Sequence, residues 1–179
     1  MRALRRKNSA RLSNLEKTAL LRRAESGEVL AQTFLGWAYS KRGDFDEDPE
    51  KAECWLRKAA SSGELEPRRR LAWFLYDQNR NDAVEVFVSL IQADDFYGHY
   101  LMGHCSVNGH CGVKKDRGMA VSHFDRAAEL GHLVSRITSL KLRFKVPLLN
   151  PKTSKEFFGL VLEAARRRAK NPDDVSIYR

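Results

Sequence analysis

Apolar residues recur along this chain at the spacing of one helical face. In residues 52–59 the apolar positions Ala52, Trp55, Leu56 and Ala59 follow an i, i+3, i+4, i+7 stripe. The segment before it carries its own apolar run with a glycine in the middle, at Gly36. Because neither stripe can be buried by one helix alone, the pattern predicts antiparallel helix pairs that stack on one another.

The pattern repeats at an uneven period. Anchors at Gly27, Gly63, Asp94 and Gly131 are 36, 31 and 37 residues apart. A small residue recurs in the first segment of each unit, and an alanine opens the second; these positions are Gly36, Ala72 and Gly103, then Ala52, Ala83 and Ala120. We therefore expect three clear helix pairs and a degenerate fourth, with a lone helix ahead of them that ends near Gly27.

Local signals set the expected ends of these helices. Residues 84–88 favour a strand on propensity, but the register of Ala83, Phe87 and Leu90 favours a helix, and we follow the register. Residues 78–81 should form a tight turn, and residues 96–107 a helix ending near Gly109. Asp48 followed by Pro49, and Asp116, have the composition of helix starts.

The fold class expected is an all-α solenoid of about four antiparallel helix pairs, with an N-terminal lone helix and a C-terminal capping helix at residues 154–170. The expected segments are a basic arm and lone helix (1–26), repeat 1 (27–62), repeat 2 (63–93), repeat 3 (94–130), a degenerate repeat 4 with the cap (131–170) and a tail (171–179).

Residues 108–120, NGHCGVKKDRGMA, resemble the loop between the two helices of Sel-1-like repeats, a tetratricopeptide-like family. Repeat 1 is similar to the same pattern at residues 35–39 (LGWAY), 48–55 (DPEKAECW) and 58–63 (KAASSG). Repeat 2 departs by lacking the interhelix loop, and repeat 4 departs at Leu140, where a small residue is expected. The resemblance implies a non-enzymatic module that binds another protein or peptide, as an adaptor, regulator or assembly factor.

In tetratricopeptide-like arrays the first helix of each pair lines the concave surface, so the resemblance implies three rows of side chains there. Counting from the small residue of each repeat, the rows are Trp37, Trp73, His104 and Lys141; Thr33, Arg69, Tyr100 and Ile137; and Ser40, Tyr76, Val107 and Phe144. The partner-binding residues expected are Thr33, Trp37, Ser40, Arg69, Trp73, Tyr76, Tyr100, His104, Lys141 and Phe144. Two tryptophans in one row are typical of binding hot spots, and packing between repeats is the alternative.

Composition narrows the class of protein. Hydrophobic residues make up 42%, charged residues 31%, and only five prolines interrupt the chain, which favours helix and excludes bulk disorder. The net charge is +9, of which +7 falls in residues 1–23. A basic module that binds nucleic acid or an acidic surface through this arm is therefore the alternative function.

Catalytic and metal chemistry have weak support. The cluster His99, His104, Cys105, His110 and Cys111 lacks the ligand spacing of a zinc site. The string Gly-His-Cys-Gly at residues 109–112 lacks the lysine and threonine of a phosphate-binding loop. We expect no enzyme activity, no cofactor and no metal, with a cryptic hydrolase as a third alternative.

The expected location is the cytoplasm. Three cysteines do not make a disulfide framework, and the basic N-terminus is followed by no apolar stretch of a secretory signal. No apolar run approaches the ~18 residues of a transmembrane helix.

Overall fold

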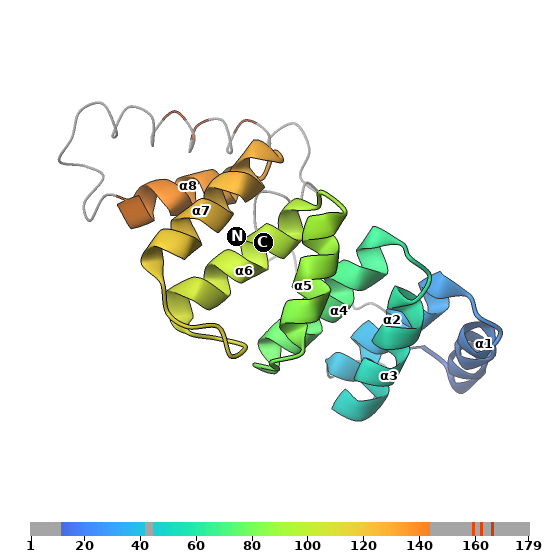
Figure 1. The fold of residues 1–179 in the computed structure, drawn as a ribbon. Coiled ribbons are helices and arrows are strands. Elements are labelled where there is room, and N and C mark those ends of the chain that lie inside the picture. Colours follow the sequence, from blue (N-terminus) through green and yellow to red (C-terminus); the bar gives the residue numbers. More distant parts are fainter. Residues whose placement is uncertain (1–11, 42–44, 144–158, 160–161, 163–165, 167–179) are drawn as a thin grey trace, which may run out of the picture. The chain divides into compact units, whose positions relative to one another are not determined.

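The computed structural model describes residues 12–41 and 45–143, together with Gly159, Leu162 and Arg166. Within these ranges the chain is helical and contains no strand. Figure 1 shows the elements in chain order: α1 (Asn14–Glu25), α2 (Val29–Ser40), α3 (Pro49–Ala60), α4 (Leu65–Asp77), α5 (Ala83–Gln92), α6 (Phe96–Asn108), α7 (Arg117–Glu129) and α8 (Leu133–Arg143). The expected all-α fold is confirmed.

The chain forms two compact units, Met1–Leu71 and Ala72–Arg179, which divide within α4. In unit 1, α2 packs on both α1 and α3. Its interior contains Ala24, Ala31, Leu35 and Trp55, against which Leu20, Leu21, Tyr39 and Phe45 pack. Helix α1 is the expected lone helix, because it supplies Ala24 to this core without a paired first helix among the described residues.

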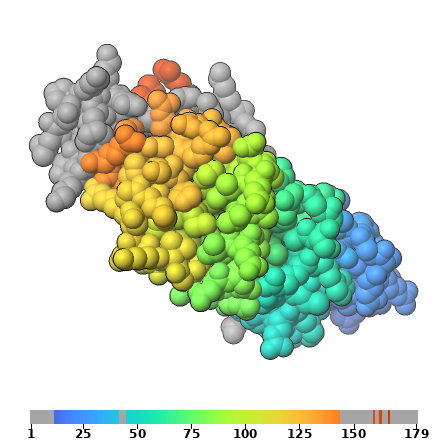
Figure 2. Space-filling view, in the orientation of Figure 1, coloured from blue at the N-terminus to red at the C-terminus, as the bar shows by residue number. Residues whose placement is uncertain are grey.

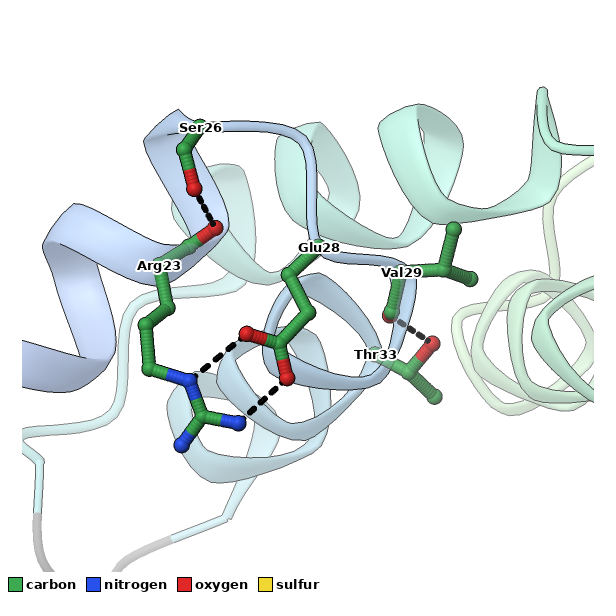
Figure 3. Close-up of polar contacts among 5 residues, drawn as sticks. All are labelled: Arg23, Ser26, Glu28, Val29 and Thr33. Atoms are coloured by element: carbon green, nitrogen blue, oxygen red, sulfur yellow. Dashed lines mark hydrogen bonds and ion pairs between the residues drawn. The ribbon is translucent and has the colours of Figure 1, made fainter.

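The junction between α1 and α2 is held by polar contacts (Figure 3). Arg23 forms a two-point ion pair with Glu28, the residue that precedes α2, with Nε to Oε2 at 2.6 Å. The Ser26 hydroxyl donates to the Arg23 carbonyl at 2.8 Å. The pair with Arg23 lowers the pKa of the Glu28 carboxyl, which stays ionised at the positive end of the α2 dipole.

In unit 2, α5 packs on α6, α6 on α7 and α7 on α8. Figure 2 shows α6, α7 and α8 as adjacent yellow-green, yellow and orange bands. Phe87, Leu90, Leu101 and Phe124 are completely buried in this unit. Sequential neighbours are thus spatial neighbours, as expected of stacked helical repeats.

Small residues set the closest helix contacts in both units. A Cβ atom at Gly36 in α2 would lie 2.5 Å from Leu56 Cγ in α3. A Cβ atom at Gly103 in α6 would lie 2.9 Å from Phe124 Cε1 in α7. Glycine at these two positions therefore allows the second helix of each pair to approach closely.

The expected helix boundaries are confirmed where the structure describes them. Asp48 and Asp116 each accept a hydrogen bond from the backbone three residues on, at 3.0 Å from Lys51 N and 2.9 Å from Met119 N. Gly109 ends α6 in the left-handed conformation, with φ of 73°. These contacts satisfy backbone groups that a helix end leaves unpaired.

Repeat 2 consists of the helices α4 and α5, which are joined by a short connection. Residues 84–88 lie inside α5, so the register prevailed over strand propensity, because Ala83, Phe87 and Leu90 are buried on one helical face. The chain turns between α4 and α5, where Arg80 N donates to Leu75 O at 3.0 Å and Asn79 has a positive φ of 52°. The expected capping helix at 154–170 lies outside the described residues, except for Gly159, Leu162 and Arg166, which are helical.

Candidate functional site

The first helix of repeat 1 carries an exposed apolar stripe in unit 1. Trp37 is 44% exposed, and its ring lies 5.8 Å from that of Phe34. One turn earlier Leu30 is 75% exposed, so Leu30, Phe34 and Trp37 occupy one face at i, i+4 and i+7. Hereafter these three residues are called the α2 patch. Trp37 is thus a surface residue and does not pack in the interior.

The two hydroxyl residues expected beside Trp37 contribute less. Thr33 is only 9% exposed, and its hydroxyl donates to the Val29 carbonyl at 2.7 Å (Figure 3). The Ser40 hydroxyl donates to the Trp37 carbonyl at 2.8 Å. Thr33 therefore belongs to the interior of unit 1: its side chain turns back on its own helix, and we remove it from the candidate surface.

A second aromatic group lies in unit 2. Trp73 is 38% exposed and stacks on Tyr76, with ring centroids 5.5 Å apart and planes 30° apart. Tyr76 in turn contacts His110 at 4.8 Å and the edge of His104 at 6.5 Å. These four residues, Trp73, Tyr76, His104 and His110, are called the α4–α6 cluster.

The loop after α6 fixes this cluster in place. His110 Nε2 lies 2.8 Å from the Tyr76 carbonyl, and because a carbonyl only accepts, Nε2 is the protonated nitrogen. The next residue in the loop, Cys111, donates its backbone N–H to Asn79 Oδ1 at 2.7 Å. The loop of repeat 3 is therefore bound to the turn of repeat 2.

The inner side of the cluster is buried and uncharged. Tyr100 is 8% exposed and meets His104 edge to face at 4.6 Å, and His104 lies 5.1 Å from Phe124 in the same manner. Burial lowers the pKa of His104 and raises the pKa values of Tyr76 and Tyr100, so all three are neutral at neutral pH. Tyr100 packs against His104 from the interior side, so we remove Tyr100 from the candidate surface.

The remaining expected residues are placed as follows. Arg69 is half-buried in the part of α4 that belongs to unit 1, and Lys141 is exposed on α8. Phe144 lies outside the described residues. One continuous face that includes residues of both units stays a prediction.

Sequence reasoning missed Leu30, Phe34 and His110 as surface residues. The signal for Leu30 and Phe34 was present, because they are seven and three residues before Trp37 on one helical face. His110 had no local signal, since its place beside Tyr76 depends on how the loop folds back.

The cysteines are free thiols in this structure. Cys105 and Cys111 are buried, and burial raises the pKa of both, whereas Cys54 is exposed. Among the described residues no group of three or more His, Cys, Asp or Glu side chains is arranged to hold a metal ion. Nor is any described helix both long and apolar enough to pass through a bilayer.

The family model of the Sel1 repeat matches residues 29–64 and 97–132, which are α2 with α3 and α6 with α7. No curated protein matches this chain. Two solved structures share the fold. One is a protective antigen of uropathogenic Escherichia coli strains that displays an SLR fold, with a TM-score of 0.67 and 20% identity over 86% of this chain. The other is a Sel1 repeat protein from Oxalobacter formigenes, with a TM-score of 0.63 and 18% identity over 80% of this chain.

The present chain covers 33% of the first structure and 60% of the second, so both proteins are longer. At this identity the likeness concerns the fold. The matched segments coincide with two of the helix pairs whose close contacts depend on Gly36 and Gly103. The chain thus contains Sel1 repeats at residues 29–64 and 97–132 and has the fold of solved Sel1 repeat proteins.

Proposed function

We propose that this chain is a non-enzymatic protein-interaction module, acting as an adaptor, regulator or assembly factor. Sel1 repeats are generally protein-interaction modules, which supports the class of function. We place the contacts on the first helices of the repeats, at the α2 patch and the α4–α6 cluster. The free cysteines of the chain favour a reducing compartment such as the cytoplasm.

The exposure of Trp37 and Trp73 is the observation that carries this proposal. Both occupy the position directly after the small residue of their repeat, and more than a third of the surface of each residue is exposed to water. Each also has an aromatic neighbour, Phe34 or Tyr76. Large indole rings, held rigid at a surface, supply most of the binding energy in many interfaces because a partner removes them from water.

The chemistry of the α4–α6 cluster favours a partner segment that is apolar with polar groups, and not one that is highly charged. Tyr76 and His104 are neutral at neutral pH, and the indole N–H, phenol and imidazole groups of the cluster can each form hydrogen bonds. A peptide or protein surface that buries an apolar side chain against Trp73 fits this lining.

A second candidate function rests on the distribution of charge. Residues 12–41 and 45–143 hold equal numbers of basic and acidic side chains, so the whole net charge of +9 belongs to the rest of the chain. Residues 1–11 and 144–179 carry this excess. Attraction to nucleic acid or an acidic surface would then depend on the chain ends and decline steeply with salt. Retention on heparin, with and without residues 1–11, separates this function from the first.

The test compares the first helices of the repeats with the second helices. Trp37→Ala and Trp73→Ala remove side chains from the first helices, and the matched controls Val88→Ala and Met119→Ala remove exposed apolar side chains from second helices. Proteins captured by the parent chain are identified, and the best of them is purified and titrated against all five chains. We expect the tryptophan variants to weaken its binding at least tenfold, which is about 1.4 kcal/mol each.

Equal weakening by the controls would refute the first-helix surface. Unchanged binding in the Trp37→Ala, Trp73→Ala double variant, with its helical circular dichroism intact, would refute it as well.

A further inference from the structure

Two histidines face one another across the helix pair of repeat 3. His99 in α6 and His123 in α7 have their Nδ1 atoms 3.1 Å apart. The ring centroids are 5.4 Å apart, and the rings are inclined by 42°. Both side chains are half-buried, so the pair lies at the edge of the core with access to water.

Packing of the repeat does not require histidine at either position. In repeat 1 the residues in the same register are Gln32, which donates to the Ala24 carbonyl at 2.9 Å, and Trp55, which is buried in the core of unit 1. In repeat 2 they are Arg68 and Val86. Of these three repeats, only repeat 3 has two imidazoles at these positions. The pair is therefore a candidate for a role other than the packing of the two helices.

The separation of the two nitrogens matches that of two ligands on one metal ion. Zinc binds imidazole nitrogen at about 2.0–2.1 Å in tetrahedral geometry, which puts two such nitrogens about 3.3 Å apart. The observed 3.1 Å is within about 0.2 Å of that separation.

We propose that His99 and His123 form a two-histidine site for a divalent transition metal ion such as Zn²⁺, with water at the other coordination positions. The described residues offer no third histidine, cysteine or carboxylate in ligand geometry, so water would fill the remaining coordination positions. An ion bound there links α6 to α7 and stabilises repeat 3 in particular.

The electrostatic surroundings keep the pair in the neutral form that binds metal. Burial lowers the pKa of both histidines, and for His99 the neighbouring His123 and Arg126 lower it further. Arg126 is itself paired with Glu129 at 2.8 Å, and both Glu129 and Asp94 act on His99 in the opposite sense. Nearby positive charge is thus partly offset by these two carboxylates.

The experiment titrates ZnCl₂ into the full chain, prepared without a histidine tag, by isothermal calorimetry at pH 7.5. A Cys54→Ser background removes the exposed thiol, which also binds zinc. We expect one equivalent of Zn²⁺ to bind, and the melting temperature to rise as zinc is added in excess.

Single variants identify the site. His99→Gln or His123→Gln should abolish that equivalent and the zinc-dependent rise in melting temperature, because one imidazole is a poor site alone. His110→Gln is the matched control, since this histidine lies outside the pair, and it should bind zinc as the parent does. Circular dichroism without metal confirms that each variant folds.

Two outcomes would overturn the proposal. One is zinc binding that persists in both His99→Gln and His123→Gln. The other is a parent whose imidazole ¹⁵N shifts for His99 and His123 do not change with zinc, which would leave the contact as an N–H···N hydrogen bond alone.

Discussion

Repeats 1 and 3 match one family model, yet they fill the same framework with different side chains. In repeat 1 the small residue Gly36 meets the flexible aliphatic side chain of Leu56, and in repeat 3 Gly103 meets the flat ring of Phe124. The close approach of the two helices is thus kept, while the group that fills the gap differs. The small residue thus fixes the helix spacing, and the opposite side chain adapts to it.

The polar positions differ more than the packing positions. Gln32 in repeat 1 closes a contact with the carbonyl of Ala24, whereas His99 in repeat 3 faces His123. The histidine pair of repeat 3 is half-buried, whereas the residues in the same register of repeat 1, Gln32 and Trp55, are buried. The following predictions test how far the framework and these additions are independent.

Filling the close contact of repeat 1 should have the largest effect. Gly36→Leu adds four carbons where even a Cβ would lie 2.5 Å from Leu56 Cγ and 3.2 Å from its backbone nitrogen. We expect a loss of about 3 kcal/mol or more in the free energy of unfolding, measured by urea denaturation. A variant as stable as the parent would show that Gly36 does not set the spacing.

The contact between α6 of repeat 3 and the preceding helix α5 should be almost as sensitive to an added side chain. A Cβ at Gly98 in α6 would lie 2.5 Å from the backbone oxygen of Phe87 and 2.9 Å from the backbone nitrogen of Ile91. Backbone atoms cannot rotate away, so Gly98→Ala should cost about 2 kcal/mol. Gly118→Ala is the matched control: its Cβ would meet only Asp116 Oδ1, at 3.3 Å, and we expect a change within about 0.5 kcal/mol. Equal stability of the two variants would contradict this assignment.

The next largest effect on stability should come from mild acid, which acts on the histidine pair of repeat 3. The pKa values of His99 and His123 are lowered in the folded chain, so below the ordinary value of 6.5 the unfolded chain binds more protons. Stability is therefore complete above pH 6.5 and decreases as the pH falls toward the folded pKa values, with Asp94, Glu129 and Arg126 as the charged neighbours. Melting temperatures between pH 7.5 and 5 should fall less in a His99→Gln, His123→Gln variant. Parallel curves would contradict the prediction.

Thiol reactivity should give the smallest effect, a difference in rate without a change in fold. Cys54 of repeat 1 is exposed, whereas Cys105 and Cys111 of repeat 3 are buried with raised pKa values. A disulfide reagent at pH 8 should modify one thiol at once and the other two only on addition of denaturant. Three fast thiols would show that the interior of repeat 3 opens readily.

Much of this fold was predictable because helix pairs follow a short-range rule. The recurrence of Gly36, Ala72 and Gly103 gave the register, and that register correctly identified α5 as a helix despite its strand-forming residues. Gly98 was not identified from the sequence. Its need for a small side chain comes from a contact with the preceding repeat, so the residues of its own repeat do not reveal it.

The candidate surface was less predictable for a related reason. Repeat positions state which helix a residue occupies, but they do not state its depth. Thr33 and Tyr100 share one row, and both are interior, since the row is turned toward neighbouring helices. His123 is in the same register as Trp55, and its contact with His99 depends on the exact rotation of α7.

The loop of repeat 3 limits how freely these units can be exchanged. Because His110 and Cys111 bind groups on Tyr76 and Asn79, the loop of one repeat completes the connection of the preceding one. The connection of repeat 2 is short, and the loop of repeat 3 binds to it. Grafting repeat 3 elsewhere, or shortening its loop, would remove the contacts that hold the connection of the preceding repeat. The natural module for transplantation is therefore residues 65–129, taken as one piece.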